Sequence, residues 1–107
     1  MRAERPRAAR YPFVTDVTLT DLESAENIIQ KTRDLSLFGC RLVPGNSLSK
    51  GARVRIQMTH QGEVFEAFGR VVDTRDNSEL GVFFTKIEDR HQLILEKWIA
   101  ELRRRGF

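Results

Sequence analysis

The stretch Arg53-Val54-Arg55-Ile56-Gln57-Met58-Thr59-His60 alternates between polar and apolar side chains without a break. A period of two places the three apolar side chains on one face of a β-strand and the polar ones on the other. Residues 60–63 then supply a hairpin turn around Gly62, and a second run returns over residues 64–73. This part of the chain therefore predicts an antiparallel hairpin with one buried face.

Similar short runs lie on both sides of this hairpin. In residues 13–21, Phe13, Val17 and Leu19 share one parity, and in residues 27–35 we expect Ile29 and Leu35 to point inward. The complete set of predicted strands is 13–21, 27–35, 39–43, 53–60, 64–73 and 80–85. Six short strands without intervening helices predict an antiparallel barrel or sandwich. Gly69, in the middle of its strand, indicates a bulge or sharp bend of the kind a small barrel needs.

The last segment changes to helical periodicity. Its apolar residues are Ile94, Leu95, Trp98, Ile99 and Leu102. They predict an amphipathic helix over residues 88–105, with acidic residues at its start, arginines at its end and Gly106 as a C-cap. We expect the apolar stripe to cap one mouth of the barrel, because most helical stability comes from burying such a face. The alternative is docking to a second copy or to a partner.

Length and composition indicate one ordinary globular domain. The chain has 107 residues, of which 40% are hydrophobic and 31% charged. No apolar run approaches the about 20 residues of a membrane span, and no signal peptide is recognisable, so we expect a cytoplasmic protein without membrane insertion. Cys40, the single cysteine, cannot form an internal disulfide and fits a reducing compartment.

The basic charge is concentrated at the start of the chain. Arg2, Arg5, Arg7 and Arg10 outweigh Glu4 by three charges, which is the whole net charge of +3. We therefore expect residues 1–12 to be a flexible arginine-rich arm and residues 13–107 to form the folded domain. A barrel without net charge that carries a basic arm favours the binding of a small anion over the binding of a long nucleic acid. A solvated arm without a ligand is the simpler alternative.

A D-x-S-x-x-G pattern, Asp34, Ser36 and Gly39, separates the strands 27–35 and 39–43. Short aspartate and serine side chains bond nearby backbone amides, and glycine tolerates positive φ, so one interpretation is a structural turn. The second interpretation combines this turn with the arginines that precede the first strand.

Together, the two elements resemble a PilZ domain, which carries R-x-x-x-R before its first strand and [D/N]-x-S-x-x-G between its second and third strands. The resemblance covers nearly the whole chain. Its further landmarks are Pro44-Gly45, residues 51–54, 69–72 and 80–84, and Trp98-Ile99. It implies an all-β fold with a C-terminal helix, a six-stranded antiparallel, split-barrel-like PilZ barrel. Pro6 stands where the first motif arginine is expected if Arg10 is the second.

The resemblance also implies a ligand, cyclic di-GMP, and the residues that would bind it. These are Arg5, Arg7, Arg10, Asp34, Ser36 and Gly39. An arginine fork pairs with phosphate or with the guanine O6/N7 edge, and Asp34 is able to accept hydrogen bonds from guanine N1 and N2. Arg5 or Arg7 would supply the guanidinium that is missing at Pro6. The implied protein is a cytoplasmic bacterial receptor, a monomer or weak dimer without cofactor, that relays the nucleotide signal to a protein partner.

Three other function classes are alternatives to this one. Catalysis is unsupported, because neither His60 nor His91 accompanies Ser36 in a nucleophile signature, and no metal-ligand spacing is present. A PilZ-fold adaptor that needs no nucleotide is motivated by Pro6. A barrel that binds single-stranded nucleic acid through stacking aromatics is disfavoured by the neutral charge of residues 11–107, so we expect neither DNA nor RNA as a partner.

Overall fold

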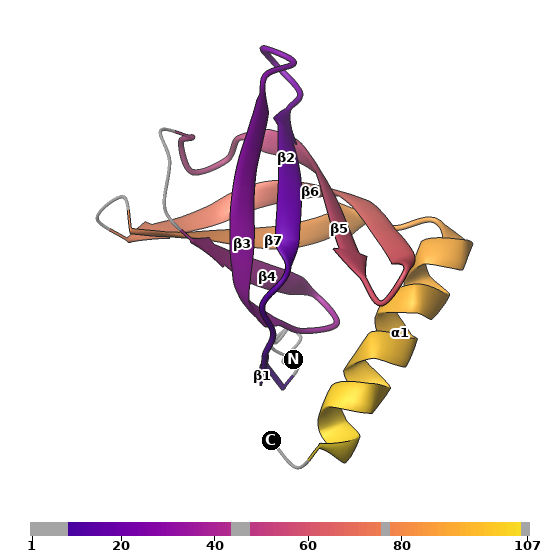
Figure 1. Ribbon diagram of the computed structural model, residues 1–107. Helices are drawn as coiled ribbons and strands as arrows, with labels where there is room; N and C mark the ends of the chain where they lie inside the picture. The colour runs from indigo at the N-terminus through magenta and orange to yellow at the C-terminus, as the bar shows by residue number, and fades with distance from the viewer. Residues whose placement is uncertain (1–8, 44–47, 76–77, 106–107) are drawn as a thin grey trace, which may run out of the picture.

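Seven strands and one helix follow one another along the residues that the computed structural model describes, 9–43, 48–75 and 78–105 (Figure 1). They are β1 (Tyr11–Pro12), β2 (Asp16–Asp21), β3 (Asn27–Leu35), β4 (Gly39–Val43), β5 (Arg53–His60), β6 (Glu63–Arg75), β7 (Glu79–Lys86) and α1 (Asp89–Arg104). The helix follows all the strands, in the order predicted.

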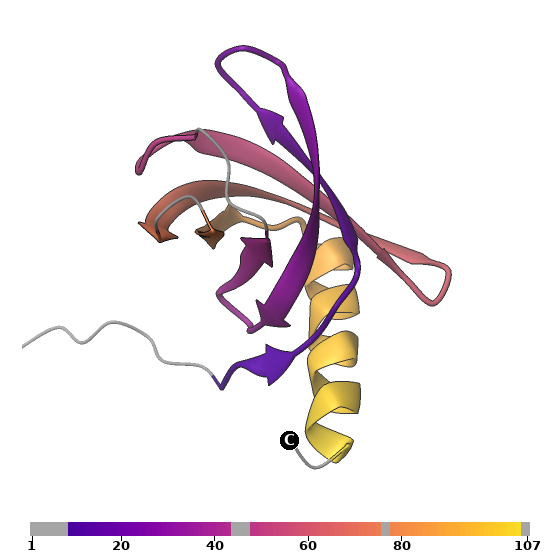
Figure 2. The same ribbon diagram turned by 60° about the vertical axis from the view of Figure 1, so that its left-hand side comes forward.

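The strands close into a six-stranded antiparallel barrel. Their order is β3-β2-β5-β6-β7-β4, and β4 pairs back onto β3, while the short β1 is an additional strand beside the end of β3. Figures 1 and 2 show the twisted barrel with α1 along one side of it, next to the β5–β6 hairpin. The predicted fold class is therefore confirmed.

The β5–β6 hairpin agrees with the alternation in the sequence. The side chains of Val54, Ile56 and Met58 are fully buried, and the polar residues between them face solvent. The turn consists of Gln61 and Gly62, with φ of 51° and 79°, and two consecutive positive φ values are typical of a type I′ hairpin turn.

Strand β3 corrects one prediction. Ile29 is 71% exposed, so its predicted inward orientation is wrong, whereas Gln30 and Thr32 are buried. A bulge between Thr32 and Asp34 shifts the register against β4. Because one extra residue reverses the parity, Leu35 points inward as predicted although Ile29, six residues earlier, does not.

The first predicted strand begins later than residue 13. Phe13 is buried, but β2 starts at Asp16. The Thr32 hydroxyl donates to the carbonyl oxygen of Phe13 at 2.6 Å and accepts from the backbone N–H of Thr15 at 2.9 Å. The Thr32 side chain therefore adds to two backbone hydrogen bonds, from the Phe13 N–H to the Arg33 carbonyl and from the Thr32 N–H to the Thr15 carbonyl, in holding this entry segment against β3.

Gly69 lies at a bulge, as the sequence predicts. The register between β6 and β7 shifts between Phe68 and Gly69. A Cβ atom at Gly69 would lie 2.7 Å from Cγ1 of Val82 and 2.9 Å from the carbonyl oxygen of Phe83. The barrel bends here because the two backbones approach too closely for any side chain. Both strands are longer than predicted, since β6 extends to Arg75 and β7 begins at Glu79.

Helix α1 completes the core. Leu95, Trp98, Ile99 and Leu102 are buried, and the Trp98 ring lies 5.7 Å from that of Phe13 and 6.1 Å from that of Phe65. The apolar stripe is thus covered within the domain, as expected, and is not left open for a partner. Arg105 is the C-cap residue, and Gly106, predicted for that role, lies outside the described residues.

Candidate functional site

The turn between β3 and β4 is held together by the Ser36 side chain. The Ser36 hydroxyl accepts hydrogen bonds from the backbone N–H groups of Phe38 at 3.1 Å and Gly39 at 3.2 Å, and it donates to the carbonyl oxygen of Gly39 at 3.3 Å. The Ser36 N–H donates to the same carbonyl at 2.9 Å. A hydroxyl has one donor and two acceptor sites, so all of its hydrogen-bonding capacity is used within the turn.

Gly39 is required for space. A Cβ atom at this position would overlap the carbonyl oxygen of Val82, and it would also lie 3.3 Å from the Cα of Phe83. Gly39 and Phe83 are paired across β4 and β7. Strand β7 therefore approaches the backbone of Gly39 closely.

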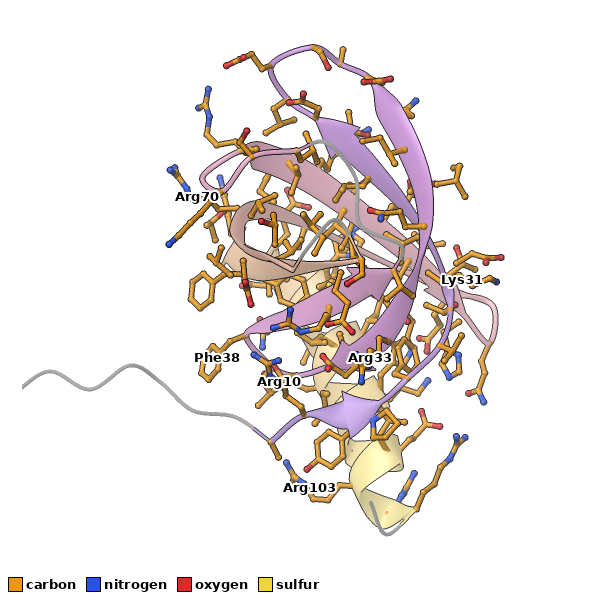
Figure 3. All side chains as sticks on the ribbon, turned by 90° about the vertical axis from the view of Figure 1, so that its left-hand side faces the viewer. Arg10, Lys31, Arg33, Phe38, Arg70 and Arg103 are labelled. Atoms are coloured by element: carbon orange, nitrogen blue, oxygen red, sulfur yellow. The ribbon has the colours of Figure 1, made fainter. Side chains whose placement is uncertain are left out.

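Asp34 is part of the β1–β3 pairing, and Arg10 directly precedes it. Tyr11 pairs with Leu35, and Pro12 pairs with Asp34, so Arg10 is exposed at the position next to the β3–β4 turn. Asp34 is half-buried. Figure 3 shows Arg10 near the turn residue Phe38 at the lower end of the barrel.

Three charged groups around this turn act on the pKa of the Cys40 thiol. Burial raises the pKa of the Cys40 thiol far above its ordinary value, and the Asp34 carboxylate raises it further, while Arg41 and Arg10 act in the opposite direction. These charged groups are therefore close enough to affect the same atom. The thiol itself is buried and stays protonated, which makes it unreactive.

A network of charges beside the turn was missed in the sequence. Arg41 of β4 is only about one-tenth exposed, and its guanidinium lies 3.3 Å from Oδ2 of Asp73 and 3.6 Å from Oε1 of Glu79. Glu79 also pairs with Arg33. Arg41 faces Asp34 across β3 and β4. Only the closed barrel brings these strands together, so no local pattern in the sequence indicates the network.

Tyr11, at the end of the predicted arm, is hydrogen-bonded to the last turn of the helix. The Tyr11 hydroxyl accepts a hydrogen bond from Nε of Arg103 at 3.3 Å, and Tyr11 is buried. The arm was predicted over residues 1–12, and the structure shows that Tyr11 and Pro12 pair with β3. The candidate ligand residues Arg5 and Arg7, and Pro6 between them, lie outside the described residues.

The two histidines have other neighbours than Ser36. The His60 ring lies 4.8 Å from the Phe13 ring, and Nδ1 of His91 accepts a hydrogen bond from the Glu66 N–H at 3.1 Å. Among residues 9–43, 48–75 and 78–105, no group of three or more histidine, cysteine, aspartate or glutamate side chains is able to hold a metal ion. Within the same ranges, no helical segment combines the length and apolar composition that crossing a bilayer requires.

Sequence comparison decides the family. The sequence model of the PilZ domain matches residues 3–101. The chain belongs to the PilZ domain family. A PilZ domain therefore accounts for the closed barrel, the C-terminal helix and the D-x-S-x-x-G turn together. Comparison with curated protein sequences gives no match.

Solved structures share this fold at low sequence identity. The PilZ domain of CeSA from a cellulose-synthesizing bacterium superposes with a TM-score of 0.73 at 18% identity, over 89% of this chain and 98% of that one. The PilZ domain of YcgR from Escherichia coli, solved with c-di-GMP, gives 0.74 at 19% identity, over 96% and 95%. The Bacillus subtilis inhibitor of motility MotI/DgrA gives 0.77 at 17% identity, over 99% of this PilZ domain but 55% of its own length. At such identities the likeness establishes the fold.

Proposed function

We propose that this PilZ domain is a bacterial cytoplasmic receptor for cyclic di-GMP that relays nucleotide binding to a protein partner. The proposal rests above all on the position of Arg10 and Asp34 beside the β3–β4 turn, where Asp34 raises and Arg10 lowers the pKa of the Cys40 thiol. The family assignment supports it, and the YcgR PilZ domain was solved with c-di-GMP.

In the proposed chemistry, a cation and a carboxylate bind different groups of the nucleotide. The exposed Arg10 guanidinium would pair with a ligand phosphate or with the guanine O6/N7 edge, which suits its planar fork. Asp34 would accept hydrogen bonds from guanine N1 and N2. Arg5 or Arg7 would approach from the arm and take the place of the arginine that Pro6 replaces.

Ser36 and Gly39 would contribute through the shape of the turn. The Ser36 hydroxyl is fully used in its own turn, so it would contact the nucleotide only if those bonds were exchanged. We therefore assign Ser36 a positioning role toward Asp34 in the free protein. Gly39 keeps β4 against β7 and so fixes the strand that follows the turn.

The test is calorimetric titration with cyclic di-GMP, with a linear guanine dinucleotide as the control ligand. Hydrogen bonds to charged groups contribute about 1.5–3 kcal/mol, so Arg10→Ala and Asp34→Ala should each weaken binding by about tenfold or more. Arg90→Ala, which removes an exposed arginine from the start of α1, should leave the affinity unchanged.

Two outcomes would count against the proposal. A flat titration of the folded wild-type protein would exclude the receptor function and leave the nucleotide-independent adaptor as the alternative. Saturable binding that survives both Arg10→Ala and Asp34→Ala would place the nucleotide elsewhere. Comparison of Arg5→Ala with Arg7→Ala then identifies which arm arginine compensates for Pro6.

A further inference from the structure

Cations and aromatic rings alternate on the outer face of β5, β6 and β7. In one row across the strands, Phe68 lies between Arg55 and Lys86. In the next row, Arg70 lies between Arg53 and Phe83. Paired residues on neighbouring strands point to the same side of a sheet. The register therefore places two phenylalanine rings within a group of four cations.

The apolar residues of this surface are well exposed, although aromatic and branched side chains are more often buried. Phe68 is 42% exposed, Phe83 40% and Val72 38%. Phe38 of the β3–β4 turn is 38% exposed and lies next to β7, since its carbonyl accepts a hydrogen bond from the Phe84 N–H at 2.8 Å. Figure 3 shows Arg70 and Phe38 projecting from the same side of the barrel. We call these residues, Phe38, Phe68, Val72 and Phe83 with Arg53, Arg55, Arg70 and Lys86, the phenylalanine face.

The charges of this face are not balanced by its own residues. In the described rows from residues 53–57, 66–72 and 83–86, Glu66 is the one carboxylate, and it lies 3.9 Å from Nε of Arg55. Arg53 and Arg70 stand directly opposite each other, and like charges in that position destabilise a sheet. Neither forms an ion pair with another residue of the described ranges. An anionic occupant would relieve this repulsion.

We propose that the phenylalanine face docks a short acidic segment of a partner protein. An apolar side chain of the segment would pack between Phe68 and Phe83, and its carboxylates would pair with Arg70 and Lys86. Phenylalanine and arginine are enriched at protein interfaces, where few residues carry most of the binding energy. The inference goes beyond the proposed function, since the phenylalanine face contains none of the residues proposed to bind the nucleotide.

The neighbouring charges favour a short acidic segment over the other occupants. Arg53 and Arg70 line a hollow together with Asp21, Glu23 and Glu26 of the β2–β3 turn. A nucleic acid strand carries a phosphate at every nucleotide and would be repelled by these carboxylates, whereas the carboxylates of a short segment need to reach only Arg70 and Lys86, on the strands of Phe68 and Phe83. A second copy bound through the same face would oppose cations to cations.

One edge of the face is continuous with the candidate nucleotide site. The Phe38 N–H donates to the Ser36 hydroxyl, and Gly39 pairs with Phe83. A change in the turn would therefore move one aromatic ring of the face. Docking is nevertheless tested without nucleotide, so that failure of this inference and failure of the receptor proposal remain distinguishable.

The experiment is a selection of displayed random dodecapeptides on the immobilised full chain. The enriched peptides are then synthesised, and their affinity is measured by fluorescence anisotropy. We expect enriched peptides in which aspartate or glutamate flanks an aromatic or aliphatic residue. A few anchor residues carry most of the binding energy of an interface, so Arg70→Glu and Phe83→Ala should each weaken binding about tenfold, which corresponds to about 1.4 kcal/mol. The matched controls Arg90→Glu and Leu93→Ala, which change exposed residues of α1, should bind like wild type.

Three results would overturn the inference. The first is enrichment without an acidic bias, or peptide binding that the two face variants leave unchanged while their melting curves show folded protein. The second is binding of an oligothymidylate probe that both face variants abolish, which would assign the face to nucleic acid. The third is a wild-type dimer in sedimentation that Phe83→Ala dissociates, which would mean that a second copy covers the face.

Discussion

The β5–β6 turn and the β3–β4 turn both connect antiparallel strands, but different physical causes hold them. At the first, Gln61 and Gly62 adopt positive φ, and a Cβ atom at Gly62 would meet nothing within 4 Å. At the second, the Ser36 hydroxyl holds the backbone, and a Cβ atom at Gly39 would overlap strand β7. One glycine is there for its conformation and the other for its size. The β5–β6 turn is a local property of the chain, whereas the β3–β4 turn depends on barrel closure.

Gly39→Ala should have the largest effect on stability. The methyl group must displace β7, whose backbone is fixed by pairing on both sides, so the free energy of unfolding should fall by about 3 kcal/mol or more. Chemical denaturation monitored by Trp98 fluorescence measures the loss. A decrease below about 1 kcal/mol would show that β4 moves away from β7 easily, and it would remove the difference between the two turns.

Ser36→Ala should be the next most damaging change. The N–H groups of Phe38 and Gly39 lose their acceptor in a part-buried turn, which should cost about 2 kcal/mol, and both amides should exchange faster with solvent. Ser24→Ala is the matched control. The exposed Ser24 hydroxyl accepts from the Glu26 N–H at 3.2 Å, and because water replaces it, the cost should be about 0.5 kcal/mol. Equal losses would mean that burial does not distinguish the β3–β4 turn.

Cys40, directly after this turn, should give it a pH dependence that the β5–β6 turn lacks. The folded pKa of the thiol is raised by burial, so the folded state keeps its proton when the unfolded chain loses it. The resulting stability is complete below pH 9.0 and falls as the pH rises beyond it, by about 1.4 kcal/mol per pH unit for one proton. Denaturation curves above and below that pH, compared with Cys40→Ala, isolate the effect, because other groups titrate in both proteins. Parallel pH profiles would mean that water reaches the thiol.

Gly62→Ala should have the smallest effect. Space is free around the turn, so the substitution costs only the left-handed backbone of a non-glycine residue, about 1 kcal/mol. Gln61→Asn should act in the opposite direction by about 0.5 kcal/mol, because asparagine tolerates positive φ and Asn-Gly favours this turn type. Thermal melting of both variants checks the two signs. A loss at Gly62 as large as that at Gly39 would contradict the distinction between conformation and size.

The parts of the fold that could be predicted are those that depend on local periodicity. The alternation of β5 and the turn at Gly62 were predicted, and both involve residues close in the sequence. The bulge at Gly69 was predicted from the glycine alone, although the strand that approaches it, β7, follows later in the chain. The inward orientation of Ile29 was wrong, because a bulge follows it in β3 at the point where the Thr32 hydroxyl bonds the entry segment. A bulge that lies beside a side-chain contact 17 residues away in the sequence is not visible in an alternating pattern.

The candidate site was predicted in part for the same reason. The turn of Asp34, Ser36 and Gly39 is a local motif, and the pairing of Tyr11 with Leu35 brings Arg10 beside it. Arg41 was not identified, because its partner Asp73 is 32 residues away and meets it only across the closed barrel. The roles of Arg5 and Arg7 remain predictions, since both lie outside the described residues.

The closure of the barrel has a consequence for how copies of this protein meet one another. Each of the six barrel strands has a hydrogen-bonded neighbour on both sides, and the described strands leave no long open edge. An open edge is the template on which strands of other molecules add during aggregation or amyloid growth. Folded copies of the barrel at high concentration are therefore protected from aggregation by strand addition. This protection should last as long as β4 stays paired between β3 and β7.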